Sequence, residues 1–557
     1  MIWKKRNEEF VAGDGESAME QLIRSRNIVD WTSFSQPIQH AEHDPFLMKD
    51  MDVAVEILHR HLSEGNRILV FGDYDVDGTT SVAMMYEWLT KLGANAKFYI
   101  PNRYEEGYGF SITGAQYAIE EKMDLVITLD CGTKDGARIE MCRNAGIDVI
   151  VCDHHEPGEL PKANALLNPK RKDCTYPFSG LSGCGVGYKL IVAYTSRHPH
   201  PNSHPSQYHD LVAIAAGADI VPMLDENRTL VAKGLYLMNR YLRPGLAALL
   251  RKSGTKRTVW DVTDLVFLLA PRINAAGRVA SGNEAVKLII AQDENEVDQL
   301  AQQVEDFNLS RRSIDQEVSA SAIAKVEADS EHAHSFVTVV YDDEWLKGVI
   351  GIVASRLIEK YYRPTIVFTK SHDVYAGSGR SIEGVDLYAA LEMCKDEIVQ
   401  FGGHTMAAGL TVLPEKMESF ASRFNAVVQE MLQGKRLEPV AYYDIPMRFN
   451  DVDIRWVEEI KSMAPFGPDN MAPVFLFENV GHVYAPKKIG ADQKHVKCTL
   501  RQSDSRGYMD AVGFGLAKEW DIIQSGSLDI LGALEINEFN GRRSVQVMIK
   551  AVREHQG

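Results

Sequence analysis

The sequence predicts an α/β protein in which a parallel-sheet domain precedes a second, smaller α/β domain and a C-terminal β-barrel. From about residue 65 to 290, short β-branched runs alternate with amphipathic stretches, as in a parallel sheet with crossover helices. A second α/β segment, from about 334 to 435, opens with FVTVVY and carries TIVF at 365–368. From about 440 the chain changes to short alternating runs such as HVYAPKKI and HVKCTLRQ, separated by Gly and Asp turns, which is typical of a small barrel.

These changes of pattern predict five segments. Residues 292–330 contain no Gly or Pro and are rich in Gln, Glu, Ala and Ser, so we expect one long helix there. A surface helix is the alternative, but its place between two α/β segments favours a connector. The expected segments are an N-terminal helical segment (1–60), the parallel-sheet domain (61–291), the connector helix (292–330), the second α/β domain (331–437) and the barrel (438–557).

Composition narrows the class of protein. The 557 residues include 60 Lys and Arg against 77 Asp and Glu, a formal charge of −17, which argues against a nucleic-acid partner. That average is uneven, because residues 440–557 hold 14 Lys and Arg against 16 Asp and Glu. No apolar run approaches the ~18 residues of a membrane span, and the N-terminus lacks the apolar core of a secretory signal. The seven cysteines form no C-x-x-C pair, so we expect reduced thiols in a cytoplasmic protein.

Acidic residues follow the predicted strands repeatedly. One or more acidic residues follow each of three predicted strands, ILVF (68–71), LVITL (125–129) and DVIVC (148–152). A fourth acidic residue follows LVAIAAGA (211–218), which could instead be the end of a helix. Carboxyl ends of parallel strands share one edge, where ligands bind, and crowded carboxylates need cations to offset their repulsion. Mixed carboxylate and imidazole ligation suits Mn²⁺ or Mg²⁺. The residues concerned are Asp73, Asp75, Asp77, Asp130, Asp153, His154, His155 and Asp219.

Simpler interpretations exist for individual features. A single Asp after a strand is often a helix N-cap, which explains Asp153 but not the whole set. The histidines of RHPHPNSHPSQYHD (197–210) lie among prolines, which indicates a surface loop rather than a metal site. LSGCGVGYKL (181–190) lacks the lysine-serine pair of a nucleotide-binding loop, so its glycines are better explained by close packing before a helix.

Three motifs carry a family resemblance. VFGDYDVDGTTS, Asp153-His154-His155 and APRINAAGR (270–278) together resemble the DHH phosphoesterase superfamily, specifically RecJ-type exonucleases that degrade single-stranded DNA. The resemblance runs from roughly residue 40 to 555. It implies a DHH catalytic domain, a DHH-associated domain and an OB-fold domain, with two Mn²⁺ or Mg²⁺ ions in the site. The implied metal ligands are Asp75, Asp77, Asp130, His154 and Asp219, with Asp73, Asp153 and His155 as supporting or additional ligands.

The resemblance also assigns residues to the nucleic acid. NRYEEGYGF (102–110) places Arg103 and Tyr108 on a loop where Arg pairs with phosphate and Tyr stacks on a base or sugar. Asn274 and Arg278 of APRINAAGR are expected to contact the phosphate chain near the metals. In the second domain, GSGRS (377–381) is expected to capture the terminal phosphate through Ser378 and Arg380. FGGHTMAAGL (401–410) brings His404 to the scissile phosphate or the attacking water.

The expected function is a metal-dependent 5′→3′ exonuclease that releases 5′-mononucleotides from single-stranded DNA in repair and recombination. A single-strand-binding protein and a RecQ-type helicase are partners implied by the family, and we expect a monomer. Two alternatives stay open: a phosphodiesterase for short oligoribonucleotides or cyclic dinucleotides, and an inactive replication scaffold. The small-molecule phosphatases of the superfamily carry a histidine where this chain has Phe71, and the ligand set is intact, so both alternatives are less favoured.

Overall fold

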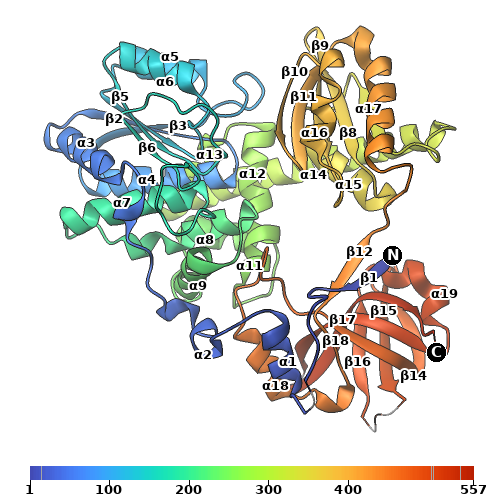
Figure 1. Cartoon of the computed structure of the whole chain (residues 1–557). Helices are drawn as coiled ribbons and strands as arrows, with labels where there is room; N and C mark the ends of the chain where they lie inside the picture. The colour runs from blue at the N-terminus through green and yellow to red at the C-terminus, as the bar shows by residue number, and fades with distance from the viewer. Residues whose placement is uncertain (14, 504, 506, 540, 557) are drawn as a thin grey trace. The chain divides into compact units, whose positions relative to one another are not determined.

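The computed structural model describes residues 1–13, 15–503, 505, 507–539 and 541–556 (Figure 1). The chain divides into two compact units. One comprises residues 42–437, and the other combines residues 1–41 with residues 438–557. Within the described part of the chain, no helix is both long and apolar enough to pass through a bilayer.

The larger unit begins with a five-stranded parallel sheet in the order β3-β2-β4-β5-β6. Alternate side chains of its strands enter two separate cores. Ile68 and Val70 pack on the α4 side, whereas Leu69 and Phe71 pack against α5 and α6 on the other side. Figure 1 shows these helices on opposite faces of the sheet. The bounds are α3 (Met51–Ser63), β2 (Arg67–Gly72), α4 (Val76–Lys91), β3 (Asn95–Tyr99), α5 (Ile112–Glu120), β4 (Leu125–Leu129), α6 (Gly136–Asn144), β5 (Asp148–Cys152), β6 (Ala165–Leu167) and α7 (Gly183–Arg197).

The strand order fixes where a site can form. From β2 the chain passes to β3 on one side and then to β4 on the other side of β2. The connections after β2 and β4 therefore leave the sheet in opposite directions, and a crevice opens between their carboxyl ends. Both strands end directly before acidic residues, Asp73 after β2 and Asp130 after β4.

A helical layer follows, and a 35-residue helix, α14, leads from it to the second domain. Val297 and Val304, in the first half of α14, pack in the core of the sheet domain. Val318 and Ala322, further along, pack with Trp345 of the second domain. One helix therefore contributes to both cores. The bounds are α8 (His209–Ala218), α9 (Asp225–Met238), α10 (Pro244–Lys252), α11 (Val262–Asp264), the π-helix η4 (Leu265–Leu269), α12 (Ala270–Val279), α13 (Asn283–Ile290) and α14 (Glu294–Ala328).

The second α/β domain is built on a mixed sheet in the order β10-β11-β9-β8-β7, in which only β7 and β8 are parallel. Its core contains Phe368 on the sheet and Phe420 and Phe424 on α17, with Phe368 and Phe420 in edge-to-face contact. The bounds are β7 (Thr338–Asp342), α15 (Ile350–Tyr361), β8 (Thr365–Ser371), β9 (Val374–Arg380), α16 (Leu387–Glu392), β10 (Gln400–His404), β11 (Ala407–Val412) and α17 (Met417–Met431).

The smaller unit is a β-barrel. Its sheet has the order β13-β14-β15-β16-β18-β17, and an additional pairing of β14 with β17 joins the two sides. Closure of this kind removes exposed strand edges. The bounds are β12 (Val440–Tyr443), β13 (Ile445–Pro446), α18 (Ile454–Lys461), β14 (Phe475–Ile489), β15 (His495–Gln502), β16 (Met509–Gly513), α19 (Trp520–Ile523), β17 (Leu528–Phe539) and β18 (Arg542–Glu554).

The N-terminus differs from the expected helical segment 1–60. Strand β1 (Ile2–Lys5) pairs in parallel with β12, and Arg26 donates a 2.8 Å hydrogen bond to Asp444. Leu22, on α1 (Ala18–Ser25), lies in the barrel core, and α2 (Trp31–Phe34) follows. Residues 1–41 therefore belong to the barrel unit, whereas α3 belongs to the sheet domain. The partners of β1 lie more than 430 positions away, so no local pattern reveals this pairing.

The predicted fold class is confirmed: a parallel α/β domain, a smaller α/β domain and a C-terminal barrel. All seven cysteines are free, six of them buried and Cys174 partly exposed.

Candidate metal centre and nucleic-acid interface

Acidic and imidazole side chains from four elements meet at the carboxyl edge of the parallel sheet. His154 Nε2 lies 3.2 Å from Asp130 Oδ1, 3.5 Å from Asp219 Oδ2 and 3.8 Å from Asp77 Oδ2. The ligand atoms fall into two overlapping groups that share His154. One contains Asp130 and His155, and the other contains Asp77 and Asp219, with all ligand atoms of a group within 4.8 Å of one another. The structure thus brings together four of the five predicted metal ligands.

The fifth predicted ligand, Asp75, stands slightly apart. It is the N-cap of α4, and its Oδ1 accepts a 3.0 Å hydrogen bond from the backbone N–H of Gly78. It belongs to neither group of ligand atoms found among the described residues. Its charge nevertheless acts on the site, because burial and the Asp75 carboxylate raise the pKa of Asp77 to about 7. Asp75 thus contributes negative charge at the edge of the cluster.

The cluster fits a divalent cation. Asp130 Oδ1 and His154 Nε2 are buried and have no hydrogen-bond partner, and neither has Asp73 Oδ1 or Oδ2, within the part of the chain that the structure describes. Burial, followed by the Asp77 and Asp75 charges, raises the pKa of Asp219 to about 9, and burial lowers that of His154 to about 3. Buried carboxylates without partners are costly unless a positive charge compensates them. Oxygen and imidazole donors at these distances suit Mn²⁺ or Mg²⁺.

The backbone at Asp130 is unusual. Its φ is +58°, in the left-handed region that residues with a Cβ seldom adopt, although Asp and Asn tolerate it best. Strain of this kind persists where the surrounding structure enforces it and is concentrated at functional sites. The conformation turns the chain sharply at the end of β4 and directs the carboxylate to His154.

Asp153 orients its neighbours through hydrogen bonds to both of its carboxylate oxygens. Its Oδ2 accepts the backbone N–H of Thr133 at 2.9 Å, and its Oδ1 accepts the N–H of His154 and Nδ1 of His155, both at 2.7 Å. Burial alone would raise its pKa, but the bonds from His155 and Thr133 hold the pKa below its ordinary value. On its other side, His155 Nε2 lies 2.7 Å from the hydroxyl of Tyr108. Both nitrogens of His155 are therefore hydrogen-bonded.

The glycine-rich segment before α7 supports the cluster. Backbone N–H groups of Gly183 and Cys184 donate hydrogen bonds of 2.7 and 2.8 Å to the two carboxylate oxygens of Asp77. A Cβ at Gly183 would lie 2.6 Å from Cβ of Asp130, closer than side chains pack. The expected close packing is therefore confirmed. In addition, the positive end of α7 holds Asp77 in place, which is the usual way a helix N-terminus binds an anion.

Positively charged side chains face the acidic cluster. The Arg103 guanidinium lies 3.9 Å from the centre of the Tyr74 ring. Burial, followed by the charges of Arg103, Arg311 and Arg380, lowers the pKa of Arg278 to about 10. Arg380 Nη1 lies 3.2 Å from Ser378 Oγ. Positive charges held this close to one another favour the binding of a polyanion between them. The predicted residues Arg103, Arg278, Ser378 and Arg380 thus lie in one region of the larger unit.

The same region ties the two α/β domains together. Arg278 Nη1 donates a 2.8 Å hydrogen bond to the carbonyl of Gly348, and the Tyr104 hydroxyl donates to the carbonyl of Arg278. A Cβ at Gly348 would lie 2.6 Å from the backbone carbonyl oxygen of Arg278, so a larger residue would force the backbone to shift. Asn274, on α12, keeps a buried Oδ1 without a partner in the described part of the chain.

His404 lies at the end of β10 and is exposed. Its Nδ1 accepts a 3.3 Å hydrogen bond from the N–H of Met406. Burial of part of the ring, together with the charges of Arg380 and His155, lowers its pKa below the ordinary value. The charges of His155, at the acidic cluster, and of Arg380, a predicted phosphate-binding residue, thus both act on this residue of the second domain.

Comparisons with known proteins agree with this arrangement. Family models match as DHH family, N-terminal domain (67–216), DHHA1 domain (334–430) and RecJ OB domain (443–551). The chain is 34% identical over 524 residues to the single-stranded-DNA-specific exonuclease RecJ of Salmonella typhimurium, covering 90% of each. The chain belongs to the RecJ family. It is 37% identical over 520 residues to the RecJ of Bacillus subtilis, covering 92% of this chain but 65% of that longer relative.

A solved RecJ structure has the same fold. The crystal structure of RecJ in complex with Mn²⁺ from Thermus thermophilus superposes with a TM-score of 0.83 at 24% identity, covering all of this chain and 80% of that chain. The family models and the relative from Salmonella typhimurium confirm the predicted resemblance to RecJ-type exonucleases as family membership.

Some residues of this RecJ-family site could not be predicted from the sequence. The N–H donors of Gly183 and Cys184 are backbone groups, and the glycine run was the only signal for them. Lys347 lies near Arg103, and both burial and that charge lower its pKa. The charge of Lys170 lowers the pKa values of both His154 and Asp219. Neither lysine lies in a recognisable motif, because each reaches the site only through the fold.

Proposed function

We propose that this chain is a divalent-metal-dependent exonuclease that degrades single-stranded DNA from its 5′ end to 5′-mononucleotides. The observation that carries the proposal is the pair of overlapping Asp and His groups at the sheet edge, faced by a cluster of arginines. Family membership supports the same activity, since the relative from Salmonella typhimurium is named a single-stranded-DNA-specific exonuclease.

Asp77, Asp130, His154 and Asp219 would hold the metal ions, with Asp75 completing the predicted set. Bound Mn²⁺ or Mg²⁺ supplies Lewis-acid chemistry, since it lowers the pKa of a water and neutralises charge developing on the phosphate.

The protein groups around the metals position the substrate. Arg103, Arg278 and Arg380 bind and screen phosphate oxygens, which fixes the scissile bond for in-line attack. Asp153 keeps His155 oriented, and Tyr108 holds its other nitrogen, so a proton at His155 is held near the reacting phosphate. Ser378 and Arg380, two residues apart on β9 and joined by a hydrogen bond, receive the terminal phosphate and so define the 5′ end.

The barrel supplies a surface for the strand. Tyr484, Tyr508 and Phe514 are exposed aromatic residues in this unit, with exposed fractions of 63% to 70%, and Lys487 and Lys488 lie close to Tyr484 in the chain. Aromatic faces with nearby cations bind single strands with little sequence preference. The region from residue 440 onward also carries far less of the net negative charge than the remainder.

The cellular setting extends the proposal. We infer a monomer acting in the cytoplasm in repair and recombination, with a single-strand-binding protein and a RecQ-type helicase as partners. Family resemblance supports these assignments. Affinity capture with each purified partner, followed by sedimentation of the chain alone, tests them.

The central test uses Asp130→Asn, because Asn retains the size of Asp and tolerates the left-handed backbone. A single strand labelled at its 5′ or 3′ end is incubated with Mn²⁺, with the same strand in a duplex as control. We expect the wild type to release labelled mononucleotide at once from the 5′-labelled strand only, and the variant to release none while melting normally. Near-normal hydrolysis by Asp130→Asn, or cleavage starting at the 3′ end, contradicts the proposal.

A further inference from the structure

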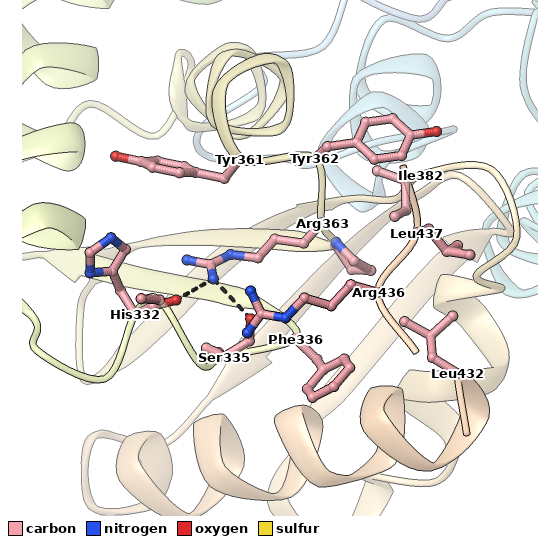
Figure 2. A pocket seen from close by; sticks show the side chains of 12 residues that line it. His332, Ser335, Phe336, Tyr361, Tyr362, Arg363, Ile382, Leu432, Arg436 and Leu437 are labelled. Carbon is pink, nitrogen blue, oxygen red and sulfur yellow. Dashed lines mark hydrogen bonds between the residues drawn. The ribbon is translucent and has the colours of Figure 1, made fainter. Parts of the chain in front are cut away.

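A cationic pocket that shares no residue with the metal centre lies in the DHHA1 domain. Its cavity volume is about 200 Å³, and it is lined by His332, Ala333, Ser335, Phe336, Tyr361, Tyr362, Arg363, Pro364, Ile382, Leu432, Arg436 and Leu437. Figure 2 shows the guanidinium groups of Arg363 and Arg436 next to each other in this pocket. None of the twelve lining residues, all within the described part of the chain, is acidic.

Arg363 is buried and rigidly held. Its Nε donates to Thr338 Oγ1 at 2.7 Å, and its Nη1 donates to the carbonyls of Ser335, at 2.9 Å, and His332. These partners are neutral, and no described carboxylate forms an ion pair with it. Burial and the charge of Arg436 lower the pKa of Arg363, whereas Asp329 raises it from a longer distance. A preorganised guanidinium without a counter-ion is a ready anion-binding group.

Arg436 brings a second charge to the same place. It is exposed, packs with its guanidinium 5.4 Å from the centre of the Phe336 ring, and forms no ion pair with any described residue. Two guanidinium groups side by side repel each other unless an anion lies between them. Two negative charges near the pocket oppose binding of an anion. Asp329 raises the pKa of Arg363, and Glu383 raises the pKa of Tyr362, which lines the pocket.

The remaining walls indicate what the anion is attached to. Phe336, Tyr362, Ile382 and Leu437 form apolar or aromatic surface around the two charges. A phosphate monoester carries close to two negative charges at neutral pH, matching two guanidinium groups, and its sugar carbons suit such walls. A cavity of about 200 Å³ is smaller than most sites for complete ligands, so it suits a phosphate and part of its sugar, with the base outside.

The pocket also adjoins the proposed terminal-phosphate element. Arg363 lies two residues before Thr365, the first residue of β8, and Thr365 pairs with Arg380, the last residue of β9. Ile382, which lines the pocket, follows Arg380 by two positions. We propose that this pocket is a second binding site for a phosphate monoester, supplied either by a free 5′-mononucleotide or by the 5′-phosphorylated end of a strand.

The test measures binding without hydrolysis, so that it stands independently of the proposed activity. The full-length chain carries Arg380→Gln, which removes the neighbouring phosphate contact, and is titrated calorimetrically in EDTA with thymidine 5′-monophosphate or a 5′-phosphorylated oligothymidylate. Thymidine and the 5′-hydroxyl oligonucleotide are the matched probes. Arg436→Gln is compared with Lys435→Gln, which removes the same charge from an exposed neighbour that does not line the pocket.

We expect Arg436→Gln to weaken binding of the phosphorylated probes about tenfold or more, since hydrogen bonds to charged groups are worth that much. Lys435→Gln should change affinity by less than about twofold, because Lys435 does not line the pocket and acts on a bound anion only through solvent. Arg436→Lys keeps the positive charge but loses the two parallel N–H donors of the guanidinium, so its affinity for the phosphorylated probes should lie between those of Arg436→Gln and its parent. A loss for the mononucleotide alone identifies a free nucleotide, and a loss for both probes identifies the strand end. The proposal is overturned if Arg436→Gln binds the phosphorylated probes as tightly as its parent does. It is also overturned if Arg436→Gln loses as much affinity for thymidine, which has no phosphate, as for the phosphorylated probes.

Discussion

The backbone N–H of Gly183 donates a 2.7 Å hydrogen bond to Oδ2 of Asp77, a residue 106 positions earlier in the chain. The neighbouring Cys184 N–H binds the other oxygen of the same carboxylate. Asp77 is thereby held by the start of one helix while it lies in the first turn of another, α4. The position of a predicted metal ligand in this site depends on the close approach of two helices.

Substituting Gly183 should therefore damage the site without large loss of fold. In Gly183→Ala the new Cβ would lie 2.6 Å from Cβ of Asp130, so the start of α7 or the Asp130 turn must shift. Displacements near 1 Å in an active site cost on the order of a hundredfold in rate. We expect a loss of this size in kcat/KM on single-stranded DNA with Mn²⁺. The control is Gly185→Ala on the same helix, whose Cβ would meet Leu181 at 3.4 Å; equal activity of the two variants would refute the steric argument.

Tyr108 is expected to act through His155. Tyr108→Phe removes the hydroxyl that lies 2.7 Å from His155 Nε2 while keeping the aromatic ring. One such hydrogen bond is worth roughly 1 kcal/mol, so turnover should fall about five- to tenfold. Because Tyr108 is about half exposed, the melting temperature should not change. Tyr236→Phe, at a similarly exposed position, is the control. If only KM rises and kcat is kept, Tyr108 serves mainly to stack on the strand.

Metal binding should be visible without any substrate. The unpartnered Asp and His groups of the cluster are stabilised when a cation binds, and a ligand at a hundred times its dissociation constant adds about 2.7 kcal/mol to folding stability. We expect Mn²⁺ to raise the melting temperature relative to EDTA, and Asp77→Asn to lose most of that increase. Glu140→Gln, on an exposed position of α6, should retain it. A Mn²⁺ shift of normal size in Asp77→Asn would remove that residue from the ligand set.

Glu42 links the stability of the larger unit to pH. Burial raises its pKa, but hydrogen bonds from His209 and Lys233, together with the Lys189 charge, bring the pKa down to about 2. Since this pKa is below the unfolded value near 4.5, the stabilisation is complete above pH 4.5 and is lost as the pH falls towards 2. The difference corresponds to about 3 kcal/mol.

Melting curves of Glu42→Gln against wild type test this linkage. The variant should melt at a lower temperature near pH 6, and the two curves should converge as the pH approaches 2. The exposed Glu56→Gln should follow the wild type throughout. A constant difference between Glu42→Gln and wild type across this range would mean that packing, not ionisation, makes Glu42 important.

The parts of the site that the sequence predicts are those encoded by position in the sheet. Asp130 and His154 follow two buried strands, and parallel pairing of those strands brings them to one edge, whereas Asp77 lies in the first turn of α4 and is also held by the start of α7. Asp219 also reaches the site, but from the end of helix α8 and not from a strand, so the helix-end alternative is the correct one there. Such residues are visible because hydrophobic runs mark strands and because strand ends share an edge.

The parts that the sequence does not predict depend on contacts across the fold. The sequence predicts that Tyr108 stacks on the nucleic acid, but no pattern around residue 108 indicates that its hydroxyl also meets His155. Arg363 and Arg436 are separated by 73 positions and read individually as ordinary surface cations. The pairing of β1 with β12 is equally invisible, because short alternating runs carry no information about distant partners.

That pairing has a consequence for how the protein is made. The barrel unit needs residues from both ends of the chain, and 396 residues, 42–437, are synthesised between them. At a usual translation rate of about 5–20 residues per second, residues 1–41 wait roughly 20 to 80 seconds for their partners. During that interval apolar side chains such as Phe10 and Leu22 have no barrel core to enter. Chaperones that shield emerging chains therefore have a target in residues 1–41, and a bulky fusion to this segment should impair assembly of the barrel before it affects the metal centre.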